Sequence, residues 1–180
     1  CGEGHNNLTD EYASIPEEMR SVARELNCNL LQEVEIEKYK SEIDPIRKKY
    51  GDRAVLRAFH FFKENERVQK QYTALQNKDI EEYLKLVNES GNSSFKYLQN
   101  IFPTVNPAKQ PMSLALALTE EFISKDSKGA CRVHGGGFAG TILVILPINS
   151  VPKYKNIIDP VFGKGSVKEL KIRKYGSYIF

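Results

Sequence analysis

Apolar residues recur every three or four positions through most of residues 14–124, and this spacing predicts a succession of helices. Gly51 ends one helical stretch, and three prolines interrupt the pattern over residues 101–111. Ser14 and Glu17 have the spacing of a capping box, which predicts the start of the first helix. We expect helices over residues 14–26, over 30–50 with an interruption at Asp44 and Pro45, from Asp52 past Leu75, over 79–91 with Asp79 as its cap, over 95–98 for a turn or two, and over 112–124.

The last third of the chain changes to a strand pattern. Residues 130–134 and the β-branched run 141–146 predict two strands, joined as a hairpin by a six-residue loop. A short helix is expected over residues 151–159, and the alternation over 167–174 predicts a final strand. These elements predict an α+β fold, rich in helix, in which an antiparallel sheet packs against helices.

Composition excludes several classes of protein. The 180 residues are 41% hydrophobic and 27% charged, as in ordinary globular chains rather than fibrous or disordered ones. The longest apolar run, residues 141–148, is far shorter than the roughly 20 residues that a membrane-spanning helix needs. The 26 basic and 23 acidic residues are interspersed and leave a net charge of +3. Neither a membrane nor a nucleic acid is therefore expected as a partner.

The cysteines predict no disulfide framework and no metal site. Cys1, Cys28 and Cys131 are odd in number and lack CxxC or zinc-ligand spacing, which is typical of thiols in a reducing cytoplasm. We therefore interpret them as structural and expect a cytoplasmic protein. A lipidated Cys1, or Cys1 as an N-terminal nucleophile, is the alternative, but no flexible polar tether and no evident base accompany it.

The hairpin loop carries the most distinctive chemistry of the chain. Four glycines lie within residues 135–140, where they permit positive φ angles and let main-chain N–H groups face a ligand such as a phosphate. A glycine-rich turn that binds nothing is the alternative. The glycines also match GxGxxG, but a dinucleotide fold requires a helix after them, and residues 141–146 are strand-like. No GxxxxGK[ST] segment of a P-loop occurs either.

Four segments together resemble a known family, the GHMP kinases, and most closely its galactokinases. The glycine segment is similar to the family's C-terminal glycine motif, two helical segments to its ENxRV and LMN-x-S helices, and one segment near the start to its H-S-L…E-Y stretch. These segments are GACRVHGGGFAGT at 129–141, FFKENERV at 61–68, LVNES at 86–90, and His5, Leu8, Glu11 and Tyr12.

The resemblance implies a C-terminal, ferredoxin-like domain of a sugar kinase. Such an enzyme transfers the γ-phosphoryl group of ATP to a sugar hydroxyl, with C1 of galactose as the expected acceptor. Residues 1–12 would be the tail of an N-terminal kinase domain with a segment of the sugar site, and residues 13–180 the C-terminal domain. That N-terminal domain, the expected partner, would hold the catalytic base and most of the ATP and Mg²⁺ contacts. The chain alone would then be an inactive fragment, which accounts for a start at Cys1 without methionine.

The same resemblance implies the residues of the site. The phenol of Tyr12, expected in a loop before the first helix, would hydrogen-bond sugar hydroxyls, and the glycine loop would support the nucleotide and line the cleft between domains. The loop positions are Gly135, Gly136, Gly137, Gly140 and, as a packing residue, Phe138.

Four other candidates are open to two interpretations. Arg132 could reach a phosphate or be a structural arginine of a strand, and His134 could act as a base or have no catalytic part. Residues 64–67 could look catalytic, but a helix-surface network at i, i+3 spacing is the simpler interpretation. His60 lies beside the apolar stripe of its helix and is expected to be a packing residue rather than a metal ligand.

Two alternative functions remain at the level of sequence. A non-catalytic relative could use the same fold to sense sugar and nucleotide through a protein partner. A free-standing binding module would require a native start near Cys1. The sequence upstream of Cys1 separates these possibilities, because an intact phosphate loop and catalytic aspartate there would favour the enzyme.

Overall fold

The computed structural model describes residues 8–172, so expectations for Cys1 and His5 lie outside the described residues. Helices dominate the described part and a single hairpin of strands follows them, as the apolar periodicity predicts. The helices are α1 Thr9–Glu25, α2 Ile36–Ser41, α3 Ile43–Tyr50, α4 Asp52–Gln76, α5 Ile80–Ser93, α6 Pro111–Asp126 and α7 Val151–Phe162, with short helical turns η1 Leu31–Glu33, η2 Ser94–Leu98 and η3 Ile148–Ser150 and strands β1 Ala130–His134 and β2 Thr141–Ile145.

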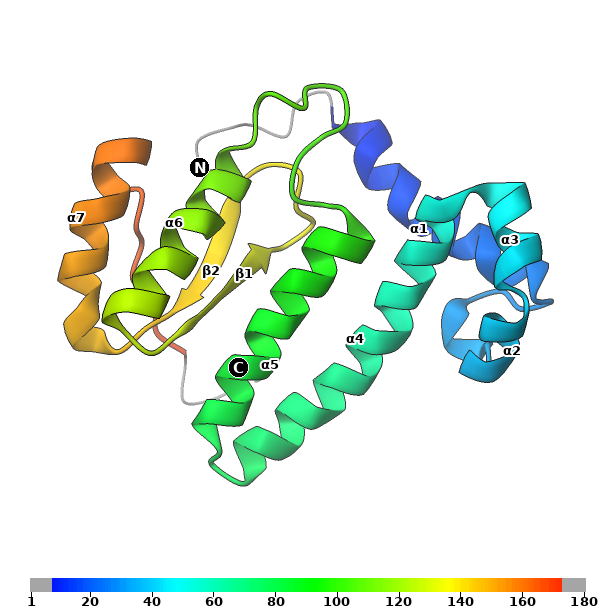
Figure 1. Ribbon diagram of the computed structural model, residues 1–180, viewed down its shortest axis with the longest axis horizontal. Helices are drawn as coiled ribbons and strands as arrows, with labels where there is room; N and C mark the ends of the chain where they lie inside the picture. Colours follow the sequence, from blue (N-terminus) through cyan, green and yellow to red (C-terminus); the bar gives the residue numbers. More distant parts are fainter. Residues whose placement is uncertain (1–7, 173–180) are drawn as a thin grey trace, which may run out of the picture.

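The long helices α4 and α5 form an antiparallel pair through the middle of the molecule (Figure 1). Helices α1, α2 and α3 lie on one side of this pair, and the hairpin with α6 and α7 lies on the other (Figure 1). Strands β1 and β2 pair antiparallel, from Ala130 opposite Ile145 to His134 opposite Thr141. The expected α+β class, with an antiparallel sheet against helices, is confirmed, and the sheet has two strands in the part of the chain that is described.

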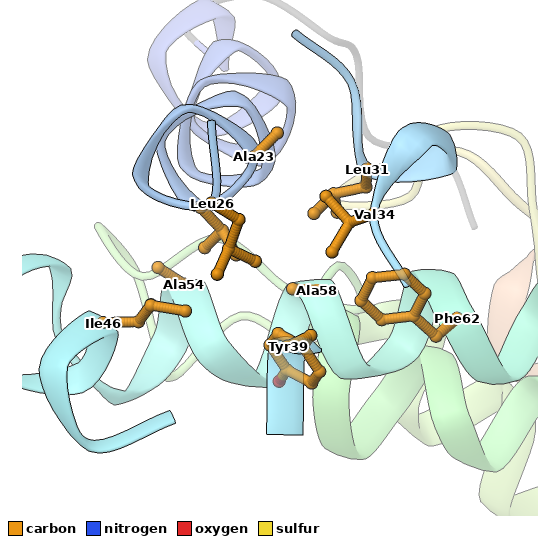
Figure 2. Close-up of a cluster of buried hydrophobic side chains, with 10 residues drawn as sticks. Ala23, Leu26, Leu31, Val34, Tyr39, Ile46, Ala54, Ala58 and Phe62 are labelled. Carbon is orange, nitrogen blue, oxygen red and sulfur yellow. The ribbon is translucent and has the colours of Figure 1, made fainter. Parts of the chain in front are cut away.

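Two apolar clusters support these two sides. The larger one lies where the first three helices pack on α4, and Figure 2 shows its side chains converging: Val22, Ala23, Leu26, Leu31, Val34, Tyr39, Ile46, Ala54, Ala58 and Phe62. The phenol of Tyr39 donates a hydrogen bond to the carbonyl oxygen of Val55 at 2.8 Å, and burial raises the pKa of Tyr39 to about 12. The second cluster packs α6 against the hairpin and includes Met112, Cys131 and Val133. Burial raises the pKa of Cys131 to about 12, so this thiol is structural, as expected.

The start of the first helix differs from the sequence prediction. Helix α1 begins at Thr9 rather than at Ser14, and the predicted capping box does not form because the Ser14 hydroxyl donates instead to the carbonyl oxygen of Glu11 within the helix. Acidic residues in the first turn of α1 favour this earlier start through the helix dipole. Helix α5 is capped as predicted, since the Asp79 side chain accepts a hydrogen bond from the backbone N–H of Glu82 at 3.0 Å.

The predicted final strand is wrong over the residues that can be checked. Residues 167–172 form no strand, although Val167 packs beside the cluster of Phe122, Tyr154 and Ile158. The apolar side chains of Leu170 and Ile172 are exposed. Alternation alone does not make a strand, because a strand also needs a partner for its backbone groups, and none pairs with this segment in the described part. The described helices include none that is long and apolar enough to cross a membrane.

Candidate functional site

The glycine loop, residues 135–140, connects β1 to β2 and lies near the start of α1 (Figure 1). Its backbone is left-handed at four positions, with φ of 72° at Gly135, 83° at Gly137, 57° at Phe138 and 101° at Gly140. Only glycine adopts such angles without strain, so the sequence fixes a sharply folded loop here. Phe138 is not a glycine, and burial of its side chain offsets the strain of its left-handed angle. The side chain is only 2% exposed and packs with Leu8 and Ala139.

Tyr12 closes one side of the loop. Its hydroxyl donates a hydrogen bond to the carbonyl oxygen of Gly137 at 2.7 Å, and its ring meets the Phe138 ring edge-on at 5.3 Å between centroids. A Cβ atom at Gly136 would lie 2.8 Å from Cε1 of Tyr12, so glycine is required at Gly136 for close approach. Burial raises the pKa of Tyr12, which keeps the phenol protonated as a donor.

The position of Tyr12 corrects one expectation. It lies in the first turns of α1 and not in a loop, because the helix starts earlier than the capping pattern predicts. Its single O–H group is directed at Gly137, so in this conformation the phenol oxygen could only accept a hydrogen bond from a sugar hydroxyl.

Asn100 also holds the loop, and no pattern in the sequence predicted this role. Its main-chain oxygen accepts from the N–H of Phe138 at 2.6 Å, and its Nδ2 donates to the carbonyl oxygen of Gly136 at 3.2 Å. A Cβ atom at Gly137 would lie only 2.0 Å from the main-chain oxygen of Asn100. The contact joins residues far apart in the chain, and local periodicity cannot show such a contact.

A third tie joins the segment after Asn100 to α1. The buried carboxylate of Glu11 accepts hydrogen bonds from both the backbone N–H and the hydroxyl of Thr104, each at 2.6 Å. Arg57, 1% exposed on α4, holds α1 in turn by donating to Ser14 Oγ at 2.9 Å and pairing with Glu18 at 2.9 Å. The start of α1, the segment 100–104 and the glycine loop are therefore one connected unit.

The other candidate residues have structural surroundings. The Arg132 guanidinium donates a hydrogen bond to Ser90 and lies 3.3 Å from Glu64, so its contacts are those of a structural arginine. Glu64 also forms an ion pair with Arg67, which is the i, i+3 contact of a helix-surface network. His134 is exposed at the end of β1.

His60 also lies in structural surroundings. It is buried, its Nδ1 lies 2.9 Å from Ser93 Oγ, and burial lowers its pKa. This is the environment of a packing residue, as expected for His60.

The site can bind through its main chain better than through charged groups. A Cβ atom at Gly135 would meet nothing within 4 Å, so the backbone is open to a ligand there. Across residues 8–172 no group of three or more histidine, cysteine, aspartate or glutamate side chains could hold a metal ion. The open backbone at Gly135 thus suits contact with a hydroxyl or phosphate group.

Comparison with known proteins points to one kind of enzyme. No family model matches the chain. The galactokinase of Mannheimia succiniciproducens is 27% identical over 154 residues, that of Actinobacillus succinogenes 28% over 154, and that of Haemophilus influenzae 25% over 160. Each match covers 86% of this chain but only 37% or 38% of the relative.

A solved structure gives the same result for the fold. The crystal structure of Lactococcus lactis galactokinase complexed with galactose matches with a TM-score of 0.69 at 18% identity, over 89% of this chain and 39% of that one. The predicted resemblance to galactokinases is confirmed over most of the chain, which spans well under half the length of these relatives.

Proposed function

We propose that this chain is the C-terminal part of a galactokinase-like sugar kinase that transfers the γ-phosphoryl group of ATP to the C1 hydroxyl of galactose. The observation that carries the proposal is the glycine loop, which is closed by Tyr12 in the same segment that resembles the galactokinase sugar site. The similarity to galactokinases along 86% of the chain supports it.

The proposed enzyme divides its work between two domains. Phosphoryl transfer depends mostly on positioning and on neutralising charge, for which Mg²⁺ bound to ATP supplies the positive charge. This chain spans only 37% of the length of a galactokinase relative. We therefore assign the catalytic base and most contacts to ATP and Mg²⁺ to the part of such an enzyme that this chain does not match. The boundary between the two parts, expected after residue 12, falls inside helix α1 and remains part of the proposal.

The residues of this chain would then bind and orient the acceptor sugar. The phenol oxygen of Tyr12 can accept from one sugar hydroxyl while its hydrogen stays on Gly137. The loop backbone at Gly135, which is open on its Cα side, can approach a hydroxyl or phosphate oxygen closely. Holding the hydroxyl in line with the phosphorus is itself a large part of such catalysis.

Two assays test the proposal. The 180-residue chain alone should show no ATP-dependent phosphorylation of any sugar above a heat-treated control, because the proposed base and nucleotide contacts lie outside it. The full-length protein should phosphorylate galactose. Turnover by the isolated chain would contradict the division of work between two domains. Absence of turnover by the full-length protein with every hexose offered would contradict the proposed sugar-kinase function.

A further inference from the structure

We infer that Asn100 is a positioning residue, which holds the glycine loop in the shape that the sugar kinase reaction requires. Its importance for catalysis rests on the proposed function, whereas its hold on the loop does not. No sequence motif or similarity assigned this residue a part.

Asn100 forms hydrogen bonds to the residues on both sides of Gly137. Its side-chain Nδ2 donates to the carbonyl oxygen of Gly136, and its main-chain oxygen accepts from the N–H of Phe138. Gly137, between them, has a φ of 83° and lies so close to Asn100 that even a Cβ atom would collide with it. The left-handed angles at Gly137 and Phe138 thus occur where the loop backbone packs against and bonds to Asn100.

The chain delivers Asn100 to this place by an unusual turn. Helix α5 continues into the π-helical turn η2, after which Gln99 takes a left-handed angle of 58° and its N–H bonds to the carbonyl oxygen of Ser94 at 2.8 Å. This reversal directs residue 100 at the loop, and only 3% of Asn100 is exposed. Further along, Glu11 fixes the segment again at Thr104. Asn100 therefore lies in a segment whose backbone is fixed by hydrogen bonds both before it, at Gln99, and after it, at Thr104.

The amide of Asn100 carries an energetic cost in the folded state. Its Oδ1 is buried and has no hydrogen-bond partner in the described part of the chain. A buried acceptor without a partner is unfavourable, so an apolar side chain of similar size would suit stability as well or better. Such a side chain cannot donate a hydrogen bond to Gly136. The contribution of the amide is therefore to fix the loop and not to stabilise the core.

A paired substitution in the full-length protein tests this role. Asn100→Leu keeps the size of the side chain, removes the unpartnered Oδ1 and removes the donor to Gly136. Asn100→Ala also removes the donor and is the second variant, used if the Asn100→Leu protein does not fold. Asn92→Leu, at an exposed position of α5, is the matched control. Hydrogen exchange of the amides in residues 135–140, thermal stability and sugar-kinase kinetics are measured on each.

We expect Asn100→Leu to raise amide exchange in the loop and to lower galactose kcat/KM, each by about tenfold or more, since one buried hydrogen bond is lost from a strained turn. Melting temperature and exchange in α4 should stay near the wild type, and Asn92→Leu should change none of these. Unchanged exchange in the loop would overturn the inference, and so would faster exchange with unchanged kinetics in an active enzyme. If the wild type phosphorylates no sugar, the proposed function fails by itself, and the exchange result still decides whether Asn100 holds the loop.

Discussion

The three consecutive glycines of the loop are required for different physical reasons. Gly135 has a left-handed backbone but open space around its Cα, and Gly136 has no positive φ but lies against the Tyr12 ring. Gly137 combines both constraints, because its backbone is left-handed and Asn100 occupies the space of a Cβ atom. A substitution series along the loop can therefore separate strain from steric exclusion.

Alanine at Gly137 should be far more damaging than alanine at Gly135. Gly135→Ala adds only left-handed strain, which costs about 1 kcal/mol. Gly137→Ala adds a collision with backbone, so we expect a loss of roughly 3 kcal/mol in loop stability and a fall of at least about tenfold in galactose kcat/KM. Chemical denaturation and steady-state kinetics of the two full-length variants provide the comparison. Equal effects of the two substitutions would show that Asn100 does not confine the loop.

The hydroxyl of Tyr12 should contribute to both the loop and the sugar site. Tyr12→Phe keeps the ring against Gly136 and Phe138 but removes the bond to Gly137, which should cost about 0.5–1.5 kcal/mol of stability. Galactose kcat/KM should fall by a similar free energy, while the KM for ATP should barely move. Tyr72→Phe, at a tyrosine that is 62% exposed, is the control. A loss of stability with unchanged sugar kinetics would remove Tyr12 from the binding site and leave it as a packing residue.

At the level of elements, an ionic network joins α4, α5 and β1 beneath the loop. Glu64 on α4 accepts from Ser90 on α5 and from Arg132 on β1, and it also pairs with Arg67. Burial raises the pKa of Glu64, but the Ser90 hydrogen bond and the two arginines outweigh it, so the pKa of this carboxyl is lowered overall. The ionised carboxylate therefore stabilises the folded state.

Neutralising Glu64 should destabilise the fold in a pH-dependent way. Glu64→Gln removes the carboxylate beside Arg132 and leaves Arg67 with the more distant Glu89 at 3.9 Å, at a cost of about 3 kcal/mol near neutral pH. Because the folded pKa is lowered, the part of this contribution that depends on ionised Glu64 is lost as the pH falls from the ordinary glutamate value of about 4.3 through the lowered folded pKa. The difference in free energy of unfolding between wild type and Glu64→Gln should therefore become smaller as the pH is lowered.

Urea unfolding of wild type, Glu64→Gln and the exposed control Glu66→Gln across the acid range measures this difference. Glu66 pairs with the partly exposed Lys63 at 3.1 Å, so its substitution should change stability by less than about 1 kcal/mol. A Glu64 effect as small as that of Glu66, or one independent of pH, would mean that the network does not hold the three elements together.

At the level of the whole molecule, local patterns predicted the kinds of elements well. The helical periodicity of α4 and the glycine-linked hairpin are properties of consecutive residues, and both are found as expected. The start of α1 was misplaced because Ser14 and Glu17 imitate a cap inside a helix that already exists. The final strand failed over residues 167–172 because its alternation lacks a partner strand. These errors arise where the outcome depends on contacts that a local pattern does not contain.

The candidate site follows the same division. Its glycines and Tyr12 are recognisable from their sequence, since a left-handed loop needs glycine and a motif resemblance covers Tyr12. Asn100 contacts a residue 36 positions away and Glu11, although part of that motif, contacts one 93 positions away, so only the three-dimensional structure shows these contacts. The sequence therefore indicated where a ligand could bind, and the fold reveals what holds that place in shape.

The identity of the phosphorylated product tests the central claim most directly. The full-length protein is incubated with ATP, Mg²⁺ and galactose, and the sugar product is identified by phosphorus and carbon NMR. We expect galactose phosphorylated at C1, formed by the wild type and reduced at least about tenfold in Gly137→Ala under the same conditions. Absence of any phosphorylated sugar from the folded wild type, or a product whose rate of formation is unaffected by Gly137→Ala, would contradict it.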